Sequence, residues 1–149
     1  MAPSDLAQFA ALSLREQGLV VVTTLRSDAT MQGSVVNAGV LDHPLTGAAA
    51  VAFVARGDSR KLINLRARPQ TTIVARAGWE WIAVEGTAEV IGPDDPAPGI
   101  DEPALRLLLR AIFTAAGGEH DDWPTYDRVM ADERRAAVVV VPRRVYSNG

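Results

Sequence analysis

The residues best suited to chemistry lie in one short run of the chain, Arg56 to Lys61, which reads RGDSRK. Asp58 or Ser59 is a suitable N-cap for a short helix. The start of such a helix carries unpaired backbone N–H groups and the positive end of the helix dipole. Three cations surround it: Arg56, Arg60 and Lys61. This combination is typical of a site for phosphate or carboxylate. A solvated basic face on a short helix would give the same pattern.

Asn64 extends this polar surface by one helical turn. It follows Lys61 by three residues and Arg60 by four, so all three lie near one helical face. Leu62 and Leu65 fall on the other side and are expected to face the core. The helix must end before Pro69, because the residue preceding a proline avoids the helical conformation.

A second candidate is the run Trp79-Glu80-Trp81, at the start of a strand predicted over residues 79–91. Alternation along a strand places the two tryptophans on one face and Glu80 on the other. Two indoles at a strand end can cover a planar ring system by stacking and exclude water from it. Packing in the core or at a subunit interface is the other interpretation, and it suits Trp81 better than Trp79.

A third candidate is the polar set Gln32, Ser34 and Asn37, on a strand predicted over residues 31–41. Gln32 and Ser34 share a face because side chains alternate, and Asn37 lies on the opposite face unless a bulge intervenes. Amide and hydroxyl groups suit a heterocycle edge that presents both donors and acceptors. A solvent-facing strand surface is the competing interpretation.

The sequence offers no metal site and no nucleophilic machinery. Cysteine is absent, and the run Glu119-His120-Asp121-Asp122 has no partner motif elsewhere. Asp121 or Asp122 is better explained as a helix cap, and His43 as an exposed turn residue. The chain lacks a nucleophile elbow, a Walker loop and a GxGxxG fingerprint, so no catalytic side chain is identified.

Composition predicts one globular domain over residues 1–149. The chain is 48% hydrophobic and 22% charged, close to the globular average. A net charge of −3 gives no general basis for binding nucleic acid. No apolar run approaches the roughly 18 residues that span a bilayer. The start of the chain lacks the basic segment of a signal peptide. We therefore expect a cytoplasmic protein.

The pattern of elements is mainly β with inserted helices. Apolar spacing predicts an N-terminal helix closed by Gly18, a helix over 102–116 and another from about 124 to 130. Six strands are predicted, over 19–25, 31–41, 48–55, 70–76, 79–91 and 136–141. Without a βαβ rhythm, an antiparallel barrel is favoured over a doubly wound sheet. Several strands are apolar on both faces, so one face needs cover from a helix or a second subunit.

Two runs resemble a known family. SRKLINLRARPQTTIVA resembles the S-x-K-x-x-N-L-x-x-x-P block of the pyridoxamine-phosphate-oxidase-like split barrels, and GWEWIAVEGTAEVIGPDD resembles the strand that follows it there. The later segments GEHDDWPTYDRVM and RRAAVVVVPRRVYS are similar to the actinobacterial F420-binding branch, the flavin/deazaflavin oxidoreductase group B. The resemblance extends over essentially the whole chain.

The resemblance implies a homodimeric, six-stranded antiparallel split β-barrel with two cofactor sites between the subunits. Lys61 and Asn64 match positions that hold the phosphate and tail of the cofactor, flanked by Ser59 and Arg60. The remaining positions would lie beside the ring or close the site, the last two from the partner subunit: Gln32, Ser34, Trp79, Met130 and Tyr146.

Departures from the family bear on the cofactor. True pyridoxamine-phosphate oxidases carry an Arg-Gln-Val-Arg-like run before Glu85-Gly86, where this chain has Trp-Ile-Ala-Val. Some relatives have arginine where this chain has Ser59, or asparagine where it has Val35. The expected function is therefore an F420H2-dependent reductase that transfers a hydride to an electron-poor small molecule, with water or Tyr146 supplying the proton. The alternatives are an FMN-dependent oxidoreductase of the same fold and a non-catalytic cofactor carrier.

Overall fold

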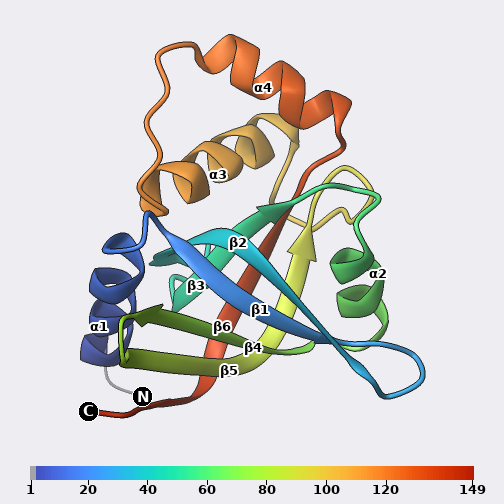
Figure 1. Cartoon of the computed structure of the whole chain (residues 1–149). Helices are drawn as coiled ribbons and strands as arrows, with labels where there is room; N and C mark the ends of the chain where they lie inside the picture. Colours follow the sequence, from blue (N-terminus) through green and yellow to red (C-terminus); the bar gives the residue numbers. More distant parts are fainter. Residues whose placement is uncertain (1–2) are drawn as a thin grey trace.

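Ten elements make up the protein, seen here in a computed structural model that describes the backbone of residues 3–149 and the side chains from residue 6 onward (Figure 1). In chain order they are α1 (Pro3–Leu14), β1 (Leu19–Leu25), β2 (Met31–Asp42), β3 (Ala49–Ala55), α2 (Arg60–Ala67), β4 (Gln70–Ala77), β5 (Glu80–Ile91), α3 (Glu102–Ala115), α4 (Trp123–Asp132) and β6 (Ala136–Ser147).

The six strands form a closed antiparallel barrel in the order β1-β2-β3-β6-β5-β4. The long strand β2 makes closure possible because it has two partners in succession. Residues 31–37 pair with β1, and residues 38–42 pair with β3. The predicted six-stranded antiparallel barrel is therefore confirmed.

Two hydrophobic cores lie on opposite sides of the sheet. The first fills the barrel and is closed by α1 and α2, with Phe9, Val22, Phe53 and Leu62 completely buried. The second lies outside, where α3 packs on β2, β3 and β6 and α4 packs against α3; its members include Ala52, Leu109, Ile112, Tyr126 and Val139. Figure 1 shows these two helices together on one side of the barrel. The apolar outer faces of β3 and β6 are thus covered by helices, one of the two expected solutions.

A glycine sets how closely α3 approaches β2. A Cβ at Gly39 would lie 2.4 Å from the carbonyl carbon of Ala115 and 2.6 Å from the nitrogen of Ala116. Because backbone atoms occupy that space, any larger residue at position 39 would push the end of α3 away from the sheet. The absence of a side chain here holds the α3 terminus against the strand that carries Asn37.

The last strand is longer than the sequence predicted. A strand over 136–141 with a polar tail was expected, but β6 continues to Ser147 and pairs with β5 along its length. Pro142 lies opposite Gly86, where the register shifts between Glu85 and Gly86. An irregularity of this kind tolerates a residue without a backbone N–H, so the proline does not end the strand.

Trp79 does not begin β5 as predicted. Ala77 pairs with Glu80, so Gly78 and Trp79 form a two-residue turn, with Gly78 at φ +60°. Trp79 is 93% exposed and therefore shares no strand face with Trp81. The apolar side chain of Trp79 suggested a strand. Gly78, which adopts a positive φ, instead places Trp79 in the turn between β4 and β5.

Other differences are local. The first helix ends at Leu14, and Gly18, at φ +76°, follows a further turn instead of closing it directly. His43 was expected to be exposed, but it is buried: its Nε2 lies 2.5 Å from Glu89, and its Nδ1 accepts backbone N–H groups of Leu45 and Thr46. Asp122 does cap α4, accepting the N–H of Thr125.

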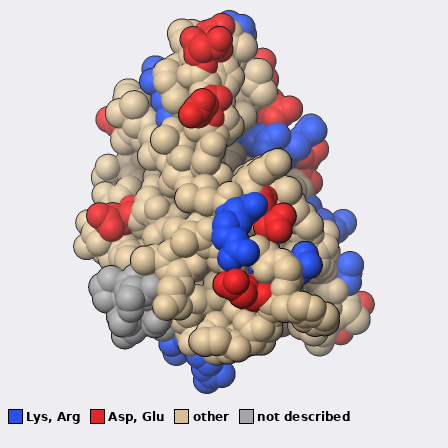
Figure 2. Space-filling view, turned by 60° about the vertical axis from the view of Figure 1, so that its left-hand side comes forward, with Lys and Arg blue, Asp and Glu red and all other residues tan. Residues whose placement is uncertain are grey.

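The charged surface is mixed. Figure 2 shows Lys and Arg side chains interspersed with Asp and Glu on the face in view, not gathered into a basic area. Of the helices described in residues 3–149, none has the length and apolar character needed to cross a membrane.

Candidate functional site

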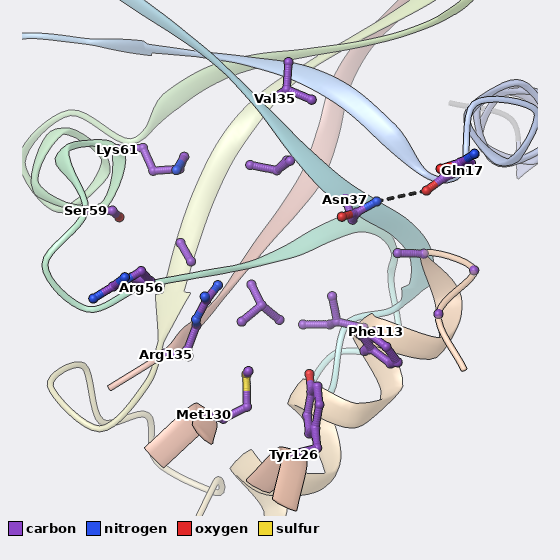
Figure 3. A pocket seen from close by; sticks show the side chains of 17 residues that line it. Gln17, Val35, Asn37, Arg56, Ser59, Lys61, Phe113, Tyr126, Met130 and Arg135 are labelled. Atoms are coloured by element: carbon purple, nitrogen blue, oxygen red, sulfur yellow. Dashed lines mark hydrogen bonds between the residues drawn. The ribbon is translucent and has the colours of Figure 1, made fainter. Parts of the chain in front are cut away.

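The candidate site is a groove of about 540 Å³, which we call the α2–α4 groove (Figure 3). It lies between the outer side of β2, the end of β3, the start of α2, the end of α3, and α4. Its volume falls within the range of small-molecule sites. Five residues proposed from the sequence line it: Asn37, Arg56, Ser59, Lys61 and Met130.

One wall of the groove is cationic, with Arg56, Lys61 and Arg135 lining it together. Arg56 lies 3.5 Å from the carboxylate of Asp58, and Arg135 donates to Glu133 at 2.8 Å. Lys61 forms no ion pair with any side chain in residues 6–149. Burial, and secondarily the charge of Arg135, lowers the pKa of the Lys61 ammonium. A bound anion would relieve both effects, because it would offset the desolvation and screen the two cations from each other.

The start of α2 adds an unusual hydroxyl to this wall. Ser59 occupies the N-cap position with an extended backbone, yet its side chain makes no capping hydrogen bond. Its Oγ is buried and has no hydrogen-bond partner among the described residues. No acidic residue occupies the first turn of α2. An anion at this helix start would therefore find free backbone donors and one unused hydroxyl beside Lys61.

The opposite wall is apolar and aromatic. Phe113 and Tyr126 pack with ring centroids 5.1 Å apart, and Met130 lies beside them on α4 (Figure 3). Val35 and Val54 contribute aliphatic surface from β2 and β3. A groove with one cationic and one apolar wall suits a flat, largely apolar molecule that carries a phosphate.

Two polar groups at the groove are already engaged. Tyr126 donates its hydroxyl to the carbonyl of Leu109 at 3.1 Å, and burial raises the pKa of that hydroxyl. Asn37 donates its side-chain N–H to the carbonyl of Gln17 at 2.9 Å, which fixes the amide at the groove edge. Neither group is a ready proton donor in this arrangement.

Three predicted residues lie away from the groove, around the other side of α2. Asn64 is 2% exposed, and its Nδ2 lies 3.0 Å from Thr24 Oγ1 and 3.1 Å from Gln32 Oε1. This network links α2 to β1 and β2 inside the barrel end. Arg60 lines a separate surface hollow beside Arg68. The structure therefore does not bring Gln32, Asn64 and Arg60 to the groove of their own chain.

The remaining predicted residues lie outside the groove as well. Ser34 faces the same way as Gln32, opposite to Asn37, as alternation predicted. Tyr146 lies near the C-terminal end of β6, where it donates to Glu85 at 2.6 Å and meets the Trp81 ring edge-on at 6.0 Å. Trp79 is held nearby, its carbonyl accepting from Asn148. Neither Trp79 nor Tyr146 reaches the groove within one chain.

Sequence reasoning missed Arg135, Phe113 and Tyr126. Phe113 and Tyr126 each lie within a predicted helix, where an aromatic residue looks like an ordinary core residue. Arg135 lies three residues after the end of α4 and immediately before an apolar strand, a position that gives no sign of its distant neighbour Lys61. A basic residue immediately before the last strand was the one available signal.

Solved structures of known proteins share this fold. A conserved hypothetical protein from Mycobacterium tuberculosis, Rv2991, is 18% identical, with a TM-score of 0.68 over 99% of this chain and 84% of that one. A pyridoxamine 5'-phosphate oxidase-related, FMN-binding protein from Nostoc punctiforme is 15% identical, with a TM-score of 0.68 over 99% and 84% of the two chains. An F420 reductase is 17% identical, with a TM-score of 0.58 over 86% and 88%.

At these identities the similarity establishes the fold, that of the pyridoxamine 5'-phosphate oxidase-like proteins. No protein-family model matches the chain.

Proposed function

We propose that this protein is an F420H2-dependent oxidoreductase that uses the α2–α4 groove to hold the cofactor and reduces an electron-poor small molecule. The observation that carries the proposal is that one groove combines a cationic wall with an apolar wall. The cationic wall contains the Ser59 Oγ, which has no hydrogen-bond partner in the part of the chain that the structure describes. Solved structures with the same fold include an F420 reductase and an FMN-binding protein, which supports a flavin-type cofactor.

Different residues of the groove would bind different parts of the cofactor. Lys61, the Ser59 hydroxyl and the free N–H groups of α2 would hold a phosphate. Arg56 and Arg135, which already pair with Asp58 and Glu133, would add positive charge near further negative groups. When bound, the cofactor supplies the hydride, while the protein supplies position and excludes water. Holding two reactants in contact can contribute roughly 7–11 kcal/mol to lowering the barrier.

Charge favours F420 over FMN. The groove presents three cations, more than one phosphate needs, and the tail of F420 carries additional carboxylates. FMN remains the second candidate, because a helix start with a serine and a lysine also suits a phosphomonoester. We expect purified protein titrated separately with F420 and FMN, followed by fluorescence, to bind F420 more tightly. If FMN binds equally or more tightly, the cofactor proposed for this groove would be FMN.

A binding protein without turnover is the third candidate, and one observation supports it. The one phenol among the residues that line the groove and are described by the structure, Tyr126, already donates to the Leu109 carbonyl. The proton for reduction would then have to come from water or from Tyr146 of the partner subunit. Incubating the F420H2 complex with a panel of quinones, nitroaromatics and conjugated alkenes decides the matter. Reoxidation by any of them supports an enzyme, and inertness toward all of them supports a carrier.

A second copy of the chain would complete the site. The outer face of β1 and β2 exposes apolar side chains that pair across the two strands, with Val35 63% exposed and Val21 42% exposed. Val35 also lines the groove, so a partner covering this face would border the cofactor. Tyr146 would then act from the partner subunit, as the family resemblance implies. Met130, which the resemblance also placed in the partner subunit, already lines the groove of its own chain.

Light scattering tests the dimer. The expected mass is about twice the 15.9 kDa of the chain. Val21→Asp should give a folded monomer with weakened cofactor binding. Dimerisation would bury the new carboxylate without a compensating positive charge, which costs free energy. A monomeric wild type that binds the cofactor fully would remove the shared-site proposal.

A further inference from the structure

A second cavity, of about 380 Å³, lies on the far side of Met130 and Arg135 from the α2–α4 groove. It opens between α3, α4 and the proline-rich loop over residues 92–101, and we call it the loop cavity. Its volume lies in the lower part of the range for small-molecule sites. Because Met130 and Arg135 line both spaces, the two cavities share a wall.

The walls of the loop cavity are mostly apolar and come from the end of β5, the proline-rich loop, α3 and α4. Ile91 and Leu109 form its deep part and belong to the outer core, with 1% and 4% exposure. Ile100 and Leu105 are partly buried against that core. The loop itself is held by ion pairs of its two aspartates, Asp94 to Arg134 and Asp95 to Arg66. An apolar space between braced walls is available to a ligand without rearrangement.

The rim of the loop cavity carries one weakly engaged cation. Arg106 has Glu102 as its nearest ion-pair partner, at 3.8 Å, beyond hydrogen-bonding distance, and it interacts with Asp127 only through its charge, which helps to lower the pKa of that carboxyl. The other rim arginines are tied, Arg134 by Asp94 and Arg135 by Glu133. Two rim carboxylates are likewise in use. Asp127 binds Arg110, and Asp101 caps α3. Arg106 is therefore the rim group best placed to meet a negative charge on a ligand.

We infer that the loop cavity is a second ligand site, one that takes a compact aromatic or alicyclic molecule with a single acidic group. The apolar body occupies the space lined by Ile91, Leu105 and Leu109, and the acidic group faces Arg106. This site is separate from the proposed cofactor groove and does not depend on which cofactor that groove binds.

Two fluorescent probes of the same ring skeleton test the inference on the full chain without cofactor. They are 8-anilinonaphthalene-1-sulfonate, which is anionic, and neutral N-phenyl-1-naphthylamine. Both should bind at one site per chain. Arg106→Gln should weaken the sulfonate about threefold, the size of an exposed charge contact, and leave the neutral probe unchanged.

A steric variant locates the probes. Ala131 is exposed on α4 and lines the loop cavity, so Ala131→Trp should fill the opening and abolish the binding of both probes. Ala111 is exposed on α3 and lines neither cavity, which makes Ala111→Trp the matched control with wild-type binding. Thermal melts of both variants confirm that each is folded.

Lys61→Gln separates this inference from the proposed function. If the probes occupy the loop cavity, that variant binds them like the wild type, whatever happens to F420 affinity. Loss of probe binding in Lys61→Gln would place the probes in the α2–α4 groove and overturn the inference. Undiminished binding by folded Ala131→Trp would overturn it equally.

Discussion

Polar side chains have hydrogen-bond partners on one side of α2 and lack them on the other, among the residues that the structure describes. On the barrel side, Asn64 is buried and its amide meets both Thr24 and Gln32. On the groove side, Ser59 has a buried hydroxyl with no partner, and Lys61 faces Arg135 with no ion pair among residues 6–149. The helix has only eight residues, so these environments are separated by less than two turns.

The difference distinguishes structural polar groups from binding ones. A buried polar group with its partners in place stabilises the fold, whereas one without partners costs free energy. The groove side of α2 therefore carries a cost in the free protein that a ligand would relieve. The comparison predicts that substitutions on the barrel side will act on stability, and substitutions on the groove side on affinity.

The largest expected effect is on the barrel side. Asn64→Leu leaves Thr24 and Gln32 without their donor, and should lower the free energy of unfolding by about 2–3 kcal/mol. Denaturant unfolding measures it. F420 affinity of the fraction that remains folded should change little. Intact stability with lost affinity would instead place Asn64 at the cofactor tail, as the family resemblance suggests.

Lys61→Ala is the strongest expected change on the groove side. A charge-assisted contact to phosphate is worth roughly 1.5–3 kcal/mol, so F420 affinity should fall roughly ten- to a hundredfold. The salt dependence of binding should also decrease, because one screened charge pair is lost. Turnover at saturating cofactor should stay nearly unchanged.

Arg60→Ala is the matched control for Lys61→Ala, since it removes an adjacent cation from the same helix that does not line the groove. Equal losses of affinity in the two variants would show that only the general charge of α2 matters.

Ser59→Ala should move stability and affinity in opposite directions. Removing a hydroxyl that is buried without a partner should raise the free energy of unfolding by up to about 1 kcal/mol. The usual loss of an N-cap is not expected, because no capping bond exists. F420 affinity should fall about tenfold through the lost hydrogen bond. Lower stability together with unchanged affinity would mean that Ser59 acts as an ordinary cap.

The smallest expected effect is a pH dependence from Lys61. Its pKa in the folded chain is lowered from 10.5, mainly by burial. In the window between the folded value and 10.5, the unfolded chain binds more protons, so stability rises with pH. Below that window the cost of the buried charge is constant.

Comparing unfolding of the wild type and Lys61→Met over alkaline pH isolates this term. The wild type should gain stability relative to the variant as pH rises toward 10.5. Bound F420 should remove the difference, because its phosphate stabilises the charged ammonium. Parallel profiles without cofactor would show that Lys61 is effectively solvated.

Local sequence signals predicted the barrel and one wall of the groove. Strand alternation and turn residues identified six strands, and the run from Arg56 to Lys61 marked the start of α2 because its residues are neighbours in the chain. The ends of the strands were harder to predict from the sequence. Pro142 suggested that the last strand ends before it. The pairing of β6 with β5, in which Pro142 lies opposite Gly86, shows that the strand continues.

The other wall depended on tertiary contacts that no local pattern contains. Phe113, Tyr126 and Arg135 come from two helices and a strand start far along the chain. They line the same groove as Lys61 only after α3 packs on the barrel and α4 packs against α3. The reverse error occurred at Asn64. Helical spacing grouped it with Lys61, but the barrel end lies close enough to engage its amide first.

The two separate cores have a consequence for motion. The outer core joins α3 and α4 to the sheet, while the barrel interior is sealed by α1 and α2. The outer helices can therefore detach in a partial unfolding that leaves the barrel intact, at a lower free energy than global unfolding. Amide hydrogens of α3 and α4 should exchange with deuterium through this opening, ahead of those in β3 and β6. Since these helices form one wall of the groove, a bound ligand would slow exchange in them most.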